Sequence, residues 1–170
     1  MACLDNKCRN TYYWVMLKTL RDEIHQTKPF TSLQEEATLG VVRTATRLQD
    51  ASEKVFKSAG ITGTQYNVLR ILRGAEPSGL CRNELRDRML TRMPDVTRLL
   101  DRMEKADLVE RSREGEDRRM VSTRITKEGQ RLLAELDPKV FAVHKRVLSH
   151  VTETQLHSLI DLLTLVRNTR

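Results

Sequence analysis

The chain has 170 residues and a formal net charge of +7, and 31% of its residues are charged against 39% that are hydrophobic. This length fits one domain or a small domain with a helical extension, and the composition argues against a disordered chain. Aromatic residues make up only 4%, which favours helices over a β-sandwich, while the positive charge indicates a nucleic-acid or anionic-membrane partner.

Residues 1–31 form an N-terminal extension in which apolar side chains between Tyr13 and Ile24 recur at helical spacing, so we expect an additional helix there. The apolar run at residues 12–17 is too short to cross a membrane, and it lacks the basic leader and cleavage site of a signal peptide. We therefore expect a cytoplasmic protein with no membrane partner. The extension could also lie upstream of a genuine start at Met16.

Three segments match the capping box, in which a Ser or Thr oxygen and a Glu or Gln side chain satisfy free amide groups at a helix start. They begin at Ser32, Thr62 and Thr152, and each precedes a helical apolar period. The first of these helices is predicted over residues 33–58, and Gly60 suits a left-handed C-cap just beyond it.

Three further helices are predicted before residue 107. The helix that begins after Thr62 ends near Gly74, and a short one follows over residues 81–89. The next covers residues 94–106 and begins with Pro94, because the missing N–H of proline would be unpaired in the first turn anyway.

The helix over residues 94–106 has one apolar face. Its apolar residues recur at i, i+3, i+4 and i+7, so this face is predicted to be buried: Val96, Leu99, Leu100 and Met103. Asp101 and Lys105 are expected to form an ordinary i,i+4 ion pair on the solvated side.

After residue 108 the pattern changes to two short stretches with β-branched residues, at 108–113 and 119–125. We predict a β-hairpin that turns at Gly115. Thr126 then caps a long helix, which Pro138 is expected to bend or break. The last capped segment carries an apolar stripe that nothing near the end of the chain covers.

Three helices followed by a hairpin, with the two helices before the hairpin joined by a short turn, indicate a winged helix-turn-helix that binds DNA. The segments ITGTQYNVLRIL, NELRDRMLTRMPDVTRLLDRMEKADLVER and EDRRMVSTRITKEGQRLL resemble the MarR family of bacterial transcription regulators in order and spacing. The resemblance covers about residues 33–168. It implies a mainly α (α+β) fold, a winged helix-turn-helix with an intertwined helical dimerisation region.

By this resemblance, residues 32–58 and 126–170 form the dimerisation region, and residues 59–125 form the DNA-binding winged helix-turn-helix. A homodimer is implied, and the uncovered apolar stripes agree with it because a two-fold dimer is the commonest way to bury them. Such a dimer offers two recognition helices to a pseudo-palindromic site in double-stranded DNA.

The helix over residues 94–106 is the expected recognition helix. Arg98 can donate two hydrogen bonds to guanine, and Thr97 can donate to a base edge or a phosphate. Asp95 could accept from a cytosine amine, but stabilising the helix N-terminus is the role we favour. The other candidates for DNA contact are phosphate-binding or tip residues: Thr91, Arg92, Pro94 and Arg102.

In the wing, the Asp-x-Arg pattern of the family falls on Asp117 and Arg119. The resemblance places Arg119 at the minor groove, where negative potential attracts guanidinium groups, and gives Asp117 the role of orienting basic neighbours. Arg118 could be a second phosphate contact, and Gly115 supports the turn.

The three cysteines, Cys3, Cys8 and Cys81, have neither disulfide nor zinc spacing, and the histidines add no metal-ligand pattern. We therefore expect no metal and no cofactor. A redox-sensing branch of the family uses a reactive cysteine, and Cys81 is the candidate here because a helix N-terminus can lower a thiol pKa. An inert thiol is the interpretation we favour.

The predicted function is a dimeric, sequence-specific transcription regulator and not an enzyme, because the sequence shows no nucleophile–base–acid set, phosphate loop or metal cluster. The resemblance implies repression that a small aromatic or phenolic effector releases. Phe56 and Tyr66 are candidate effector-lining residues, although core packing is the preferred role for both. The alternatives are a cysteine-based redox sensor of the same fold and a winged helix used for protein docking.

Overall fold

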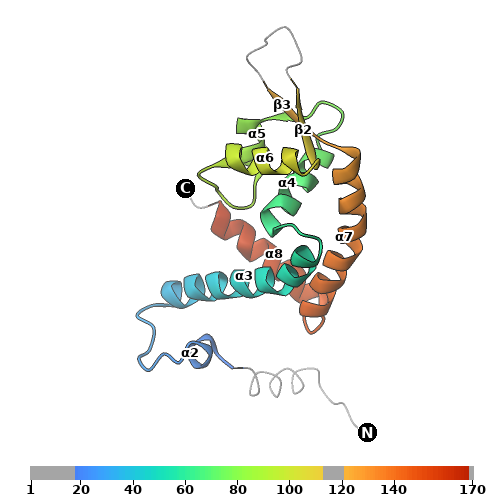
Figure 1. The fold of residues 1–170 in the computed structure, drawn as a ribbon. Coiled ribbons are helices and arrows are strands. Elements are labelled where there is room, and N and C mark those ends of the chain that lie inside the picture. The colour runs from blue at the N-terminus through green and yellow to red at the C-terminus, as the bar shows by residue number, and fades with distance from the viewer. Residues whose placement is uncertain (1–17, 113–120, 169–170) are drawn as a thin grey trace. The chain divides into compact units, whose positions relative to one another are not determined.

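The computed structural model of the protein describes residues 18–112 and 121–168. The chain divides into two compact units, Met1–Arg47 and Leu48–Arg170. Helix α3 (Leu33–Ser58) begins in the first unit and ends in the second. Most of the described chain is helical, with one small sheet in the second unit (Figure 1).

In the first unit, Thr19 caps the short helix α2 (Leu20–Glu23). The Oε2 atom of Glu23 lies 3.6 Å from Nε of Arg43 and 3.3 Å from Nη2 of Arg47, both on α3. The expected N-terminal helix is thus seen over four residues. Most of that prediction falls on residues 1–17, which lie outside the described part of the chain.

The start of α3 differs in one detail from the predicted capping box. The Oγ of Ser32 accepts from the backbone N–H of Glu35 at 3.1 Å, as predicted. The carboxylate of Glu35, however, accepts from the hydroxyl and the backbone N–H of Thr31, at 2.7 and 2.6 Å, rather than from Ser32. These hydrogen bonds lower the pKa of Glu35. The boxes at Thr62 and Thr152 are confirmed.

The second unit contains helices at the predicted places and a three-stranded antiparallel sheet in the order β1-β3-β2. The helices of this unit after α3 are α4 (Gly63–Arg73), α5 (Arg82–Arg88), α6 (Val96–Lys105), α7 (Lys127–Val147) and α8 (Glu153–Arg167). The strands are β1 (Leu80–Cys81), β2 (Val109–Ser112) and β3 (Ser122–Ile125). The pairing of β2 with β3 confirms the predicted hairpin arms. Strand β1 was missed, because two residues are too few for a periodic pattern.

Helix α6 begins at Val96, so the prediction that it starts with Pro94 is wrong. Asp95 is the N-cap, and its side chain accepts a hydrogen bond from the backbone N–H of Arg98. An aspartate at the N-cap stabilises a helix by about 1 kcal/mol, and this outweighs the preference of proline for the first turn.

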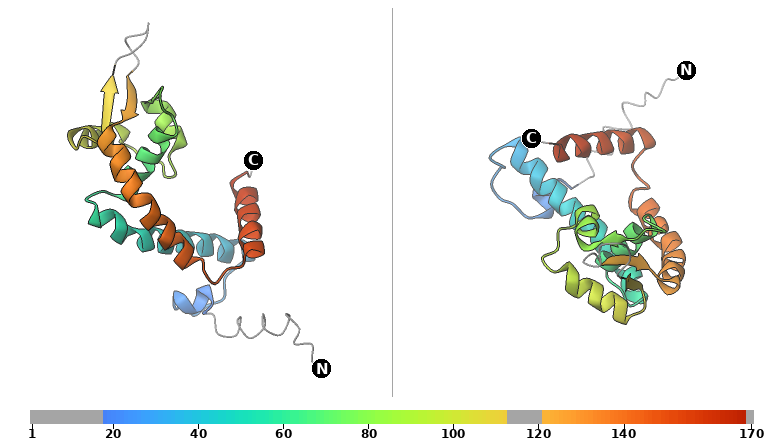
Figure 2. Two further views of the ribbon diagram at one scale, coloured as in Figure 1. Left: turned by 90° about the vertical axis from the view of Figure 1, so that its right-hand side faces the viewer. Right: turned by 90° about the horizontal axis from the view of Figure 1, so that it is seen from above.

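Helix α7 passes through Pro138 without a break (Figure 2), so of the two predicted effects, a bend or a break, the break is wrong. Proline removes the N–H that would bond to the carbonyl of Ala134. Both residues are exposed, so water can satisfy that carbonyl. At the start of the same helix, Thr126 is the predicted N-cap, and its hydroxyl accepts from the backbone N–H of Gly129 at 3.0 Å.

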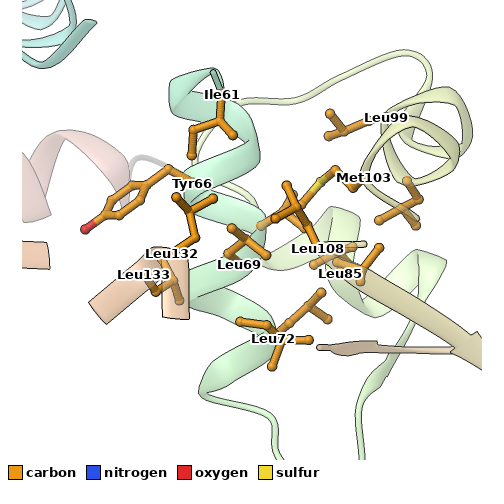
Figure 3. Packing of buried hydrophobic residues seen from close by; sticks show 14 of the residues in the cluster. Ile61, Tyr66, Leu69, Leu72, Leu85, Leu99, Met103, Leu108, Leu132 and Leu133 are labelled. Carbon is orange, nitrogen blue, oxygen red and sulfur yellow. The ribbon is translucent and has the colours of Figure 1, made fainter. Parts of the chain in front are cut away.

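One apolar core joins the helix-turn-helix, the strands and the first half of α7 (Figure 3). Each of the helices α4 to α7 contributes completely buried side chains to it, among them Leu69, Leu85, Met103 and Leu133. The core therefore holds the first half of α7 against the helix-turn-helix and the strands as one body, because close-packed interiors resist relative movement of their parts.

Among the described residues, helices α3 and α8 expose several apolar side chains each in the single chain. Helix α8 has no buried residue, and its large apolar residues are 42–69% exposed: Leu159, Ile160, Leu162, Leu165 and Val166. On α3, Leu33 and Val42 are 81% and 59% exposed. Within the described ranges, no helix is both long and apolar enough to cross a membrane.

Gly129 allows a close approach between α7 and the strands. A Cβ at this position would overlap the carbonyl oxygen of Leu108 and lie 2.8 Å from Cγ1 of Ile125. The same carbonyl accepts from the backbone N–H of Thr126 at 3.2 Å, so it cannot move away freely.

Gly129→Ala is expected to lower the free energy of unfolding by about 1–3 kcal/mol, because backbone atoms have to shift. Gly74→Ala is the matched control. Gly74 has a φ of −73°, and a Cβ there would have its nearest neighbours at 3.5 and 3.6 Å, so a change within about 0.5 kcal/mol is expected. Urea unfolding at one protein concentration measures both. Equal stability of the two variants would contradict the close approach.

Candidate nucleic-acid interface

Helix α6 is held by one buried face. Its four buried residues are those predicted from the spacing: Val96, Leu99, Leu100 and Met103. They pack the helix against α5 and β2. A helix of ten residues is marginal in water by itself, so this packing rather than helix propensity keeps α6 formed.

The opposite face of α6 carries exposed polar and basic side chains. Thr97, Arg98 and Arg102 are all exposed, and the side chain of Arg98 is 86% exposed. Helix α5 precedes α6 across a turn of seven residues (89–95), so the two form a helix-turn-helix (Figure 1). An exposed, basic second helix is what docking in the major groove requires.

Asp95 stabilises the N-terminal tip of α6. Its Oδ1 accepts from the backbone N–H of Arg98 at 2.9 Å, and its Oδ2 lies 3.0 Å from Nε of the same residue. The helix-stabilising role favoured for Asp95 is therefore seen in the structure. The ion pair is exposed and consequently weak, so the guanidinium of Arg98 remains available to DNA.

The turn before α6 is also exposed. Thr91, Arg92 and Pro94 all face solvent, and the backbone N–H of Leu90 donates to Oδ1 of Asn67 on α4 at 3.1 Å. This hydrogen bond ties the turn to α4. The predicted contact residues from 91 to 102 thus lie together on one exposed stretch of the helix-turn-helix.

An ion-pair cluster fixes the base of the wing to α6. Arg111 on β2 donates to Oε2 of Glu104, and its Nη2 lies 2.7 Å from Oδ1 of Asp101. The hydrogen bond to Arg111 lowers the pKa of Glu104. Among the described residues Asp101 therefore pairs with Arg111, and the predicted pair with Lys105 is wrong. The ion pairs of Arg111 were not predicted, since its partners lie seven and ten residues away in the sequence and belong to a helix rather than to its own strand.

The predicted tip of the wing falls between the two described ranges of the chain. Gly115, Asp117, Arg118 and Arg119 lie outside the described residues. The strands that lead to them are described, with β2 ending at Ser112 opposite Ser122 on β3.

A cavity of about 330 Å³ lies beside α6. Its wall includes Cys81, Arg82, Thr97, Leu100, Arg111 and Thr123. The Nη1 of Arg82 donates to Oγ1 of Thr97 at 3.4 Å, and Cys81 is a free, half-buried thiol. This cavity could not be predicted from the sequence, because its residues come from five helices and strands with no common period. Within the described ranges, no three metal-ligating side chains come together.

Phe56 and Tyr66, the candidate effector-lining residues, are both buried in the core. Their ring centroids are 4.9 Å apart, with the planes tilted by 34°. The hydroxyl of Tyr66 donates to Oδ1 of Asp137 at 2.7 Å. Burial and this hydrogen bond raise the pKa of Tyr66 to about 12. Both rings therefore pack in the core, which is the role preferred for them from the sequence.

Comparison with known proteins adds to this geometry. A model of the MarR family matches residues 59–120, the segment that holds the helix-turn-helix. The HTH-type transcriptional regulator FarR of Neisseria gonorrhoeae is 30% identical over 112 residues, which cover 66% of this chain and 75% of FarR.

Two solved structures have the same fold. A MarR transcription factor from Planctomyces limnophilus is 39% identical, with a TM-score of 0.61 over 81% of this chain and 99% of that one. NadR, solved in complex with 4-hydroxyphenylacetate, is 24% identical, with a TM-score of 0.68 over 84% of this chain and 100% of that one.

The exposed basic face of α6, the paired wing strands and these relatives lead to one conclusion. The chain belongs to the MarR family, whose members are DNA-binding transcription regulators with a winged helix-turn-helix and not enzymes.

Proposed function

We propose that the protein is a homodimeric repressor that binds a pseudo-palindromic operator and leaves it when a small aromatic acid binds. The exposed basic face of α6 carries this proposal, because a helix held by one apolar stripe presents its other side to the major groove. Residues 59–125 contact DNA in this account, and residues 32–58 and 126–170 form the dimer.

The dimer is supported by apolar surface that the single chain leaves uncovered. Leu162 and Leu165 of α8 are 61% and 69% exposed, although the helix is well capped and regular. Burial of such side chains stabilises an assembly by roughly 25 cal/mol for each Å² removed from water. A second copy of the chain supplies the same apolar faces and closes the assembly with two-fold symmetry.

Each contact residue has a proposed role. Arg98 reads guanine through two hydrogen bonds, and Thr97 donates to a base edge or a phosphate. Arg92 and Arg102 bind phosphates and fix the register without reading sequence, as Arg118 does in the wing. Arg119 enters the minor groove, and Asp117 orients the basic side chains around it.

The effector proposal rests on the cavity next to α6. NadR binds 4-hydroxyphenylacetate, an aromatic carboxylate. In this chain the cavity combines an apolar wall at Leu100 with the guanidinium of Arg82, which makes no ion pair within the described ranges. A carboxylate bound by Arg82 would compete for its hydrogen bond to Thr97. Since Thr97 is on the recognition helix, the effector would lower the affinity for DNA by linkage.

Arg98→Ala is expected to weaken operator binding and to relax the preference at one base position by about 1–3 kcal/mol, because it removes a bidentate base contact. Arg102→Ala is the matched control on the same face. It should weaken binding to all sequences alike and reduce the salt slope by about 1. Anisotropy titrations against operator and random DNA at several salt concentrations measure both. Identical losses on all sequences for Arg98→Ala would contradict its reading role.

Aromatic carboxylates are expected to release the operator complex, whereas the corresponding neutral alcohols should not. Arg82→Gln should raise the half-releasing concentration of 4-hydroxyphenylacetate about tenfold or more, since a charge-assisted hydrogen bond is lost. Arg86→Gln, one turn further along α5 and outside the cavity wall, should leave it unchanged. An equal response of both variants would place the effector elsewhere.

A further inference from the structure

Asp137, in the middle of α7, accepts two hydrogen bonds from α4. The hydroxyl of Tyr66 donates to Oδ1 at 2.7 Å, and Nη1 of Arg73 donates to Oδ2 at 2.6 Å. Both oxygens of one carboxylate are thereby occupied by one neighbouring helix. In the part of the chain that the structure describes, these two are the side-chain hydrogen bonds that join α4 to α7.

The tyrosine is itself held firmly. Tyr66 is 7% exposed, and its ring packs against Phe56, which belongs to α3. Its hydroxyl points away from the apolar cluster, toward the polar edge of the core (Figure 3). The guanidinium carbon of Arg70 lies over this ring, 5.9 Å from its centroid. Three helices, α3, α4 and α7, thus meet at a single phenol.

The charges at this junction are stable at neutral pH. Burial favours the protonated form of Asp137, but the hydrogen bonds from Arg73 and Tyr66 outweigh it and hold the pKa of the carboxyl below its usual value. The pKa of Tyr66 is raised to about 12, first by burial and then by Asp137. The carboxylate is therefore ionised and the phenol protonated, which is the combination that the two hydrogen bonds need.

The backbone of α7 lacks one helical hydrogen bond in the same turn. Asp137 directly precedes Pro138, which cannot donate to the carbonyl of Ala134, so the turn that carries Asp137 has one hydrogen bond fewer than a regular helix. The surrounding contacts of Leu69 and Leu133 are apolar and have no directional preference. The hydrogen bonds from α4 add directional contacts to this packing and fix more narrowly how α4 is oriented on this turn.

We propose that Asp137 is a positioning residue that sets the orientation of the winged helix on the dimerisation helices, and hence the separation of the two recognition helices. The proposal rests on the proposed dimeric, DNA-binding function. It follows from geometry: α4 belongs to the DNA-binding part, α7 runs on beyond Asp137 toward α8, and a small rotation at the junction becomes a larger displacement at α6.

Three variants test the proposal. Asp137→Asn removes the charge and keeps the volume, and Tyr66→Phe removes one hydrogen bond and keeps the buried ring. Glu135→Gln is the matched control, because it removes an exposed pair with Lys139 at 2.7 Å on the same helix and does not reach α4. Circular dichroism and sedimentation of each variant establish that it is folded and has the oligomeric state of the wild type.

The informative measurement is operator affinity at two half-site spacings, the native one and one lengthened by a base pair. Wild type and Glu135→Gln should prefer the native spacing. Asp137→Asn should bind the native site about tenfold more weakly, since a charge-assisted contact is lost. The ratio of its affinities for the two spacings should fall toward one. Tyr66→Phe should shift the preference in the same direction by a smaller factor.

A simple loss of stability would weaken binding to both sites equally and leave the spacing preference intact. That result for Asp137→Asn and Tyr66→Phe would overturn the proposal. A wild-type protein with no specific complex on any site would instead refute the proposed function itself, so the two failures are distinct. The double variant with Arg73→Gln and Asp137→Asn should bind the operator no more weakly than the weaker of the two single variants, because the two residues act through the same contact.

Discussion

The exposed basic surface of α6 depends on how this ten-residue helix is held by one apolar stripe. Val96, Leu99, Leu100 and Met103 are buried, and each contributes on the order of 1.5–3 kcal/mol, which a helix too short to form alone requires. Because these positions occupy one side of α6, the residues between them face outward. The same packing that forms the helix therefore selects Thr97, Arg98 and Arg102 as the exposed surface.

Polar contacts at both ends complete the placement of α6. Asp95 caps its first turn, and Arg111 binds Asp101 and Glu104 near its last turn, so the base of the wing cannot rotate independently of the helix. At the other side of the core, Gly129 lets α7 approach the carbonyl of Leu108. The first half of α7 is thus packed in one body with the helix-turn-helix.

Helix boundaries and the face of α6 could be predicted because they depend on neighbours in the sequence. A capping box spans four residues and an apolar stripe repeats every three or four, so Thr62, Thr126 and Thr152 marked helix starts correctly. Even there, competition between local signals decided the detail. Asp95 rather than Pro94 sets the start of α6, as its N-cap. The carboxylate of Glu35 accepts a hydrogen bond from Thr31 rather than from Ser32.

Contacts between distant segments produce no local pattern in the sequence from which they could be predicted. Asp137 is 71 residues from Tyr66 and 64 from Arg73, and the two-residue strand β1 exists only because β3 lies beside it. The cavity at Thr97 combines residues from positions 81 to 123 for the same reason. Side chains of this kind become visible only when the fold brings them together, whereas the buried face of α6 could be predicted from its own residues.

Hydroxyl-radical footprinting on the DNA upstream of the gene tests most directly whether paired α6 helices read an operator. A two-fold dimer should protect two symmetric segments whose centres are one helical turn, about 10–10.5 base pairs, or a multiple of it apart. Protection spread evenly along the fragment, or confined to a single segment, would contradict the account.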